Sequence, residues 1–408
     1  MSWEKVSIGE LLVESRIPCE NPDPNRRIKV KLHVQGIEKR PLENEMKGAT
    51  KQFIRKAGQF IYGKQNFHKG AFGVVPAELD GFETSADIPS FDVRKDCLPE
   101  WIYYFFKSGN RYLELEKLAR GVGSQRIHPK QIYDIEIPLP PKDKQEELIH
   151  NIIDTESNFE NLSKEQTHQV SLLKKLRQQI LQDAMQGKLV PQDPNDEPAS
   201  KLLERIKTEK EKLIKEKKIK KDKPLPEITA EEIPFEIPEN WEWCRFIDIV
   251  SIQSNLVSPF DFPNHPHIAP DNIEKGTGKL LDYRTVIEDN VISSNHYFFP
   301  KQLIYSKVRP KLNKVVKVDF EGLCSADMYP LRPFIYSEYL LYCMLSSYFI
   351  IEVDKFDNRV KMPKINQNQL SQIPIPLPPF AEQMRIASKI KQLMKLCEEL
   401  EQSIQQNK

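Results

Sequence analysis

The chain lacks long hydrophobic runs, paired cysteines and a net charge of either sign. No apolar run approaches the ~20 residues of a membrane-spanning helix, and the N-terminal MSWEKVSIGE has no signal-peptide core. The six cysteines are scattered without a CxxC pair, which favours reduced thiols over a disulfide framework or a zinc site. These features predict a cytoplasmic globular protein. Because the net charge is only +1, any nucleic-acid binding must come from local basic patches.

Catalytic motifs are missing as well. Residues 276–279 (GTGK) lack the first glycine of a phosphate-binding loop and the Ser or Thr that should follow it. The chain has no NPPY-type methyltransferase tetrapeptide, no GxGxxG after a predicted strand and no HExxH. His265 and His267 alternate, but no third metal ligand accompanies them. We therefore expect a chain with no active site, metal or cofactor of its own.

What the chain does contain is an internal repeat. The sequence IPLPPKDKQ at residues 137–145 recurs as IPLPPFAEQ at 375–383. Each copy opens a predicted helix whose apolar residues alternate in steps of three and four, as in a coiled-coil seam. The repeat extends backwards, because QFIYGK at 59–64 resembles QLIYSK at 302–307 and SAD at 85–87 recurs at 325–327. A period this long indicates duplicated domains.

The expected fold class is α+β, with a mainly β core and one packing helix in each repeated unit. The predicted organisation is a globular domain at 1–140, a long central helix at 141–190, a charged and Pro-rich linker at 191–239, a second globular domain at 240–378 and a C-terminal coiled-coil helix at 379–408. The Lys/Glu run at 200–223 has two interpretations. It is a solvated helix or mobile tether, which its interspersed glutamates favour, or a basic arm on DNA phosphate.

Two windows at equivalent places, 47–77 and 290–318, each contain six Lys or Arg residues and no acidic residue. Cations, amides and aromatics in such turn-rich segments can contact phosphates or base edges. The alternative is two ordinary sheet surfaces with solvated lysines, but the recurrence favours nucleic acid. The candidate DNA-contact residues are Arg55, Lys56, Tyr62, Lys64, Gln65, Asn66, His68 and Lys69 in the first window, and Tyr305, Lys307, Arg309, Lys311, Asn313 and Lys314 in the second.

A second pair of loops precedes each long helix, at 121–126 (GVGSQR) and 358–361 (NRVK). Small residues here would let the backbone approach a ligand closely, although a plain connector would need the same residues. These loops add Ser124, Gln125, Arg126, Arg359 and Lys361 to the candidate DNA-contact residues.

Taken together, the motifs resemble the DNA-specificity subunit of type I restriction–modification enzymes. The resemblance is carried by the two IPLPP-x-x-x-Q helix starts, LRQQILQDAMQGKLVP at 176–191, LLERI at 202–206, IPENW at 237–241 and IYSKVRP at 304–310. It covers nearly the whole chain and departs from the family pattern in the short second helix.

The resemblance implies two target-recognition domains separated by two long antiparallel coiled-coil helices. It also implies a non-catalytic chain that recognises a bipartite double-stranded DNA target and directs methylation and restriction. The implied partners are two methyltransferase subunits that bind S-adenosylmethionine and motor–nuclease restriction subunits that use ATP and Mg. The alternative function is a coiled-coil adaptor that pairs protein partners without specific DNA recognition.

Overall fold

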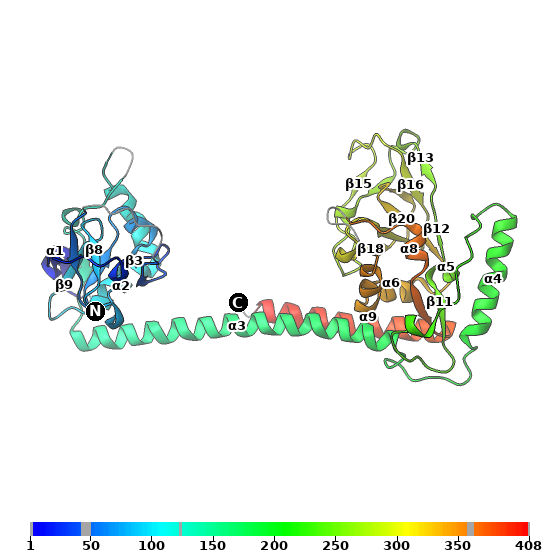
Figure 1. Ribbon diagram of the computed structural model, residues 1–408, viewed down its shortest axis with the longest axis horizontal. Coiled ribbons are helices and arrows are strands. Elements are labelled where there is room, and N and C mark those ends of the chain that lie inside the picture. The colour runs from blue at the N-terminus through cyan, green and yellow to red at the C-terminus, as the bar shows by residue number, and fades with distance from the viewer. Residues whose placement is uncertain (1–2, 42–49, 122–124, 357–362, 407–408) are drawn as a thin grey trace. The chain divides into compact units, whose positions relative to one another are not determined.

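The computed structural model describes residues 3–41, 50–121, 125–356 and 363–406. The chain divides into two compact units, Met1–Ser163 (unit 1) and Lys164–Lys408 (unit 2), with the boundary inside helix α3 (Lys142–Met185). Figure 1 shows a mixture of short strands and packing helices in each unit. None of the helices in the described part of the chain combines the length and apolar character that a bilayer crossing requires.

Unit 1 is built on an antiparallel sheet with strand order β2-β9-β6-β7. Helix α2 packs on this sheet through Phe106, whose ring lies 5.0 Å from that of Phe67 and 6.0 Å from that of Phe72, forming an aromatic core. The elements are β1 (Lys5–Ser7), α1 (Ile8–Leu11), β2 (Leu12–Ser15), β3 (Ile28–Val30), β4 (Ile37–Lys39), β5 (Gln52–Ile54), β6 (Phe60–Tyr62), β7 (Phe72–Val74), β8 (Glu83–Ser85), β9 (Ser90–Val93), α2 (Pro99–Lys107) and β10 (Glu136–Pro138).

Unit 2 repeats this sheet with the order β12-β20-β17-β18 and adds a second sheet, β13-β16-β19-β14-β15. Its elements begin with α4 (Ala199–Lys215), β11 (Glu242–Arg245), α5 (Phe246–Ile249), β12 (Val250–Ile252), β13 (Leu256–Val257), β14 (Pro266–Ile268), β15 (Arg284–Thr285), β16 (Asn295–Phe298) and β17 (Leu303–Ser306). They continue with β18 (Val315–Lys317), β19 (Gly322–Cys324), β20 (Met328–Pro333), α6 (Ser337–Leu345), α7 (Ser347–Asp354), α8 (Gln367–Ser371), β21 (Pro374–Leu377) and α9 (Phe380–Gln406).

The register of the strands confirms the duplication. In unit 1, β1 pairs with β10 so that Val6 lies opposite Ile137; in unit 2, β11 pairs with β21 so that Cys244 lies opposite Ile375. The two pairs are displaced by the same interval as the IPLPP motifs. Helices α1 and α5, and α2 and α6, are displaced by that interval too. The predicted α+β class with two similar units is therefore confirmed.

The glutamine of the IPLPP-x-x-x-Q motif fastens each long helix to its unit. Gln145 is buried; its Oε1 accepts a hydrogen bond from the Leu98 N–H at 2.8 Å, and its Nε2 donates to the carbonyl of Pro140 at 2.8 Å. Gln383 repeats this by accepting from the Tyr336 N–H at 2.9 Å. The prolines before it can start a helix but cannot lie within one. The motif thus fixes where each helix starts.

The predicted pairing of the long helices lies within unit 2. Helix α9 runs back along the unit 2 part of α3, as Figure 1 shows. Near the end of α9, Gln166 Nε2 donates to the Ile404 carbonyl at 3.4 Å, and Arg177 forms an ion pair with Glu401 at 2.8 Å. At the other end, residues of α3 and α9 share the buried core of the unit. The two helices are therefore antiparallel, as expected.

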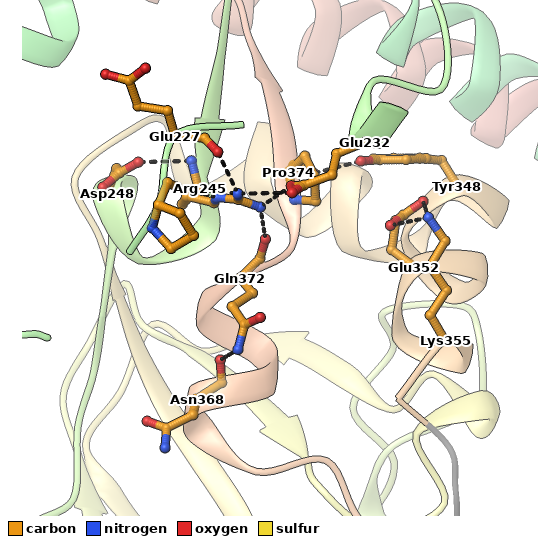
Figure 2. Close-up of polar contacts among 11 residues, drawn as sticks. Glu227, Glu232, Arg245, Asp248, Tyr348, Glu352, Lys355, Asn368, Gln372 and Pro374 are labelled. Carbon is orange, nitrogen blue, oxygen red and sulfur yellow. Dashed lines mark hydrogen bonds and ion pairs between the residues drawn. The ribbon is translucent and has the colours of Figure 1, made fainter. Parts of the chain in front are cut away.

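The charged and Pro-rich segment at 191–239 packs against the rest of unit 2. In α4, Ala199, Leu202 and Ile206 are buried in the same core cluster as α5. Figure 2 shows that Arg245 holds the Pro-rich part through an ion pair with Glu232 and a hydrogen bond donated to the Glu227 carbonyl at 3.2 Å, while it also donates to the Gln372 carbonyl at 2.8 Å. The mobile-tether interpretation is therefore wrong for α4, because its apolar face is buried while its Lys and Glu side chains cover the outside.

Candidate nucleic-acid interface

The two basic windows contain the equivalent hairpin loop in each unit. In unit 1 the window centres on the loop between β6 and β7 (residues 63–71, hairpin loop 1), and in unit 2 on the loop between β17 and β18 (residues 307–314, hairpin loop 2). Both loops join the last two strands of the repeated sheet. The predicted recurrence of cations at equivalent places thus has a structural basis, since one hairpin has been duplicated.

Hairpin loop 2 contains two residues with left-handed backbone conformations, one of which is the exposed Arg309. Arg309 and Asn313 both adopt left-handed conformations, with φ of 47° and 46°. Asparagine tolerates this region better than most residues, and Asn313 is also pinned by a 2.8 Å hydrogen bond from its Nδ2 to the Met344 carbonyl in α6. Arg309 is exposed and has no ion pair within the described ranges. Its guanidinium is therefore available to an external acceptor.

Hairpin loop 1 is held by its aromatic and glycine residues. Phe67 is fully buried in the aromatic core. Gly70 has φ of +80°, and a Cβ there would lie 2.8 Å from the Val34 backbone nitrogen, so glycine is required on both counts. Between them, Lys69 is exposed and has no ion pair among the residues that the structure describes. The loop therefore presents Lys69 from a fixed backbone.

The structure sorts the predicted contact residues by accessibility. Exposed side chains belong to Lys56, Gln65, Lys69, Gln125, Arg309 and Lys311. Half-buried ones belong to Lys64, Asn66, Arg126, Lys307 and Lys314. Those in the interior are Arg55, Tyr62, His68, Tyr305 and Asn313. Ser124, Arg359 and Lys361 lie outside the described residues.

Arg55 is the most deeply enclosed cation among the candidate residues. It is 1% exposed, and its guanidinium donates to Thr84 Oγ1 at 2.6 Å, to Ser90 Oγ at 2.9 Å and to the Ser15 carbonyl at 2.9 Å. Burial lowers the pKa of Arg55 to about 10, against the opposing charge of Glu14. Its donors are used inside the fold, so this structure offers none of them to an external acceptor.

The side chains of Tyr62, Tyr305, Asn313 and His68 are likewise buried. Tyr62 is fully buried and donates its hydroxyl to the Ile127 carbonyl at 3.2 Å, while Tyr305 is fully buried against α7. Burial is the cause that raises the pKa of both phenols. The side chain of Asn313 fixes its own loop, and His68 is only 8% exposed. These residues shape the hairpins without reaching their surface.

Acidic side chains from other segments reduce the positive charge of the windows. In the second window the ion pairs are Lys307–Asp327 at 3.5 Å, Lys311–Asp354 at 2.7 Å and Lys314–Asp271 at 3.4 Å. In unit 1, Arg126 of the 121–126 loop pairs with Asp87 at 3.4 Å. All of these carboxylates lie outside the acid-free windows in sequence. Among the exposed candidate residues, Lys56, Lys69 and Arg309 are the cations for which the described part of the chain provides no ion pair.

Sequence reasoning missed one cation. Lys364 stands where the repeat interval places the counterpart of Arg126, and it forms an ion pair with Asp327 at 3.0 Å. Extending the alignment of the two IPLPP motifs backwards would have found it. As for metals, the described residues contain no group of three or more His, Cys, Asp or Glu side chains that could hold an ion.

Comparison with protein families gives a match to each unit separately. Residues 2–172 and 238–407 both match the family described as the type I restriction modification DNA specificity domain. Among curated proteins, the chain is 36% identical over 308 residues to the specificity subunit of the type I restriction enzyme EcoDI of Escherichia coli, covering 75% of this chain and 65% of that protein.

A second curated specificity subunit and a solved structure are also similar to this chain. The EcoAI specificity subunit of Escherichia coli is 36% identical over 240 residues, which cover 56% of this chain and 41% of that protein. The chain thus spans between two fifths and two thirds of the length of these relatives. The crystal structure of the HsdS subunit from Thermoanaerobacter tengcongensis has the same fold, with a TM-score of 0.60, 16% identity, and coverage of 99% of this chain and 92% of that chain.

Proposed function

The chain belongs to the type I restriction modification DNA specificity domain family, and from this membership we propose that it is the specificity subunit of a type I restriction–modification enzyme. Each unit would bind one half of a bipartite DNA target. The single observation that supports this most strongly is the duplication. The family matches both units, and both place cations on the same hairpin of the same sheet.

The hairpins suit DNA because a two-stranded β-ribbon fits the major groove. Lysines such as Lys56 and Lys69 would neutralise phosphates, which supplies affinity without sequence preference. Arg309 and Gln65 are exposed and have side chains that can form bidentate contacts with guanine and adenine, respectively. The two loops differ in length and sequence, so the two half-sites would differ.

The catalytic steps would belong to partner subunits. We assign methylation to methyltransferase subunits that bind S-adenosylmethionine, and cleavage to motor–nuclease subunits that use ATP and Mg. This chain would act with them in the cytoplasm as the part that selects the DNA. The basis is family membership together with the absence of catalytic motifs from the sequence.

Selection from a random duplex library tests the proposal directly. The full chain is incubated with the library at moderate salt, and the bound duplexes are sequenced. The expected result is enrichment of two short conserved blocks separated by a fixed number of unspecified base pairs. Enrichment of no sequence over the input library would reject the proposal, because binding through phosphates alone carries no sequence information.

A further inference from the structure

Asp327 in unit 2 holds two cations at the base of hairpin loop 2. Its Oδ1 lies 3.5 Å from Lys307 Nζ and 3.0 Å from Lys364 Nζ. Lys307 also donates to the Ala326 carbonyl at 2.6 Å and lies 5.5 Å from the ring centre of Tyr329. Two ammonium groups therefore share one carboxylate oxygen, and each has only part of its hydrogen-bonding capacity filled.

The backbone brings the three residues together from distant segments. The Lys307 N–H donates to the Asp327 carbonyl at 3.0 Å, and the Ile365 N–H donates to the Lys307 carbonyl at 3.0 Å. The arrangement therefore joins the end of β17, the turn before β20 and the segment before α8. All three side chains remain partly exposed, at 23% for Lys307, 43% for Asp327 and 36% for Lys364.

Unit 1 contains the same backbone arrangement, with one ion pair to its carboxylate. The Lys64 N–H donates to the Asp87 carbonyl at 2.9 Å, and the Ile127 N–H donates to the Lys64 carbonyl at 2.8 Å. Arg126 stands where unit 2 has Lys364, with its Nε 3.4 Å from Asp87 Oδ1. Hence two units of different loop sequence both place a carboxylate beside a cation at the foot of the hairpin, with two ion pairs in unit 2 and one, Arg126–Asp87, in the described part of unit 1.

A carboxylate in a phosphate-binding surface lowers the affinity of that surface for DNA, so its presence there needs a separate reason. Asp327 adds a negative charge that DNA would repel, yet it aligns two long side chains that would otherwise move freely. Ordering such side chains costs conformational entropy on binding, and prior alignment removes that cost. Burial alone would raise the pKa of Asp327, but the hydrogen bond from Lys364 and the charges of both lysines lower it, so the carboxylate stays ionised.

We propose that Asp327 is a positioning residue that holds Lys307 and Lys364 so that this pair binds one phosphodiester of the DNA backbone and sets the docking position of hairpin loop 2, and that Asp87 positions Arg126 in the same way beside hairpin loop 1. This inference rests on the proposed function. Phosphate contacts carry no base information, but they fix the register in which base contacts are made. The carboxylates would therefore raise the preference for the correct sequence while lowering binding to DNA in general.

The test compares Asp327→Asn with Asp354→Asn in the full chain. Both variants remove one negative charge, and Asp354 pairs with Lys311 on the same hairpin loop. Affinity is measured by fluorescence anisotropy for the duplex selected from the random library and for a scrambled duplex of equal length. Asp327→Asn should bind the selected duplex about tenfold more weakly, which corresponds to ~1.4 kcal/mol, and the scrambled duplex equally well or better.

The control Asp354→Asn should leave the ratio of the two affinities unchanged. Lys364→Arg should also retain it, because unit 1 has arginine at that place. Asp87→Asn should reduce selectivity in the other half-site only. A ratio for Asp327→Asn equal to that of Asp354→Asn would overturn the inference. So would equal losses on both duplexes with a lower unfolding temperature, which would indicate a structural role. If the unmodified chain prefers no duplex, the proposed function itself fails, and the inference with it.

Discussion

Replacing Arg55 with alanine should destabilise unit 1 without removing a DNA contact. The guanidinium is 1% exposed and donates to Thr84, Ser90, Ser15 and Ile88 through bonds of 2.6 to 3.0 Å. Removing the guanidinium leaves buried acceptors without their donors, at ~1–3 kcal/mol each, and the lost side chain leaves a cavity, so we expect a loss of ~4 kcal/mol. That is a large fraction of the ~5–15 kcal/mol that stabilises a typical domain.

Hydrogen exchange of the full chain measures this loss in each unit separately. Peptides covering β6 and β9 should lose amide protection in Arg55→Ala, whereas peptides covering β17 and β20 should not change. The matched control is Lys56→Ala, which removes the neighbouring exposed cation and should alter stability by less than ~0.5 kcal/mol. An Arg55→Ala chain that keeps full protection but loses affinity for DNA would refute this assignment and return Arg55 to the interface.

Three further outcomes are expected. Arg309→Ala should weaken binding to the selected duplex by ~1–3 kcal/mol in anisotropy titrations and relax selectivity in one half-site only; uniform weakening over all sequences would make Arg309 a phosphate contact. Burial raises the pKa of the Glu382 carboxyl, although Trp241 and Gln192 donate hydrogen bonds to it. Because the folded pKa is the higher one, the stability that Glu382 contributes is fully present below its unfolded pKa near 4.5 and is lost as pH rises through the folded pKa. Denaturant unfolding should therefore show wild type gaining stability relative to Glu382→Gln on acidification from neutral pH, and a pH-independent difference would contradict this. If α3 sets the spacing of the half-sites, inserting seven residues after Ser157 adds about 10 Å and should lengthen the unspecified spacer by about three base pairs, as read from the selected motif.

Much of the fold follows from the repeat in the sequence. Aligning the two IPLPP motifs predicts two similar units, and the pairing of Val6 with Ile137 in one and of Cys244 with Ile375 in the other confirms it. The helix starts at Lys142 and Phe380 were also predictable, because proline followed by a helical pattern marks a helix N-terminus. The second sheet of unit 2 was not predicted, since its short strands carry no clear alternation of apolar and polar residues.

The candidate site was predicted less well than the fold. Counting charges along the sequence located both hairpins, but it could not show that Arg55 points inward, because Thr84 and Ser90, which hold it, are distant small polar residues. Nor could it show that carboxylates from other segments, such as Asp327, form ion pairs with lysines of the acid-free windows. Burial and charge pairing depend on the tertiary structure, whereas local patterns report only periodicity.

The claim that each unit recognises its own half of the target is tested most directly by methylation sequencing in cells. DNA is sequenced at single-molecule resolution from cells that express the methyltransferase partner with either this chain or a chimera carrying residues 1–135 of a relative. The account predicts a modified motif with two specific blocks around a fixed spacer, of which the chimera changes one. A chimera that changes both blocks, or a motif with a single continuous block, would contradict it.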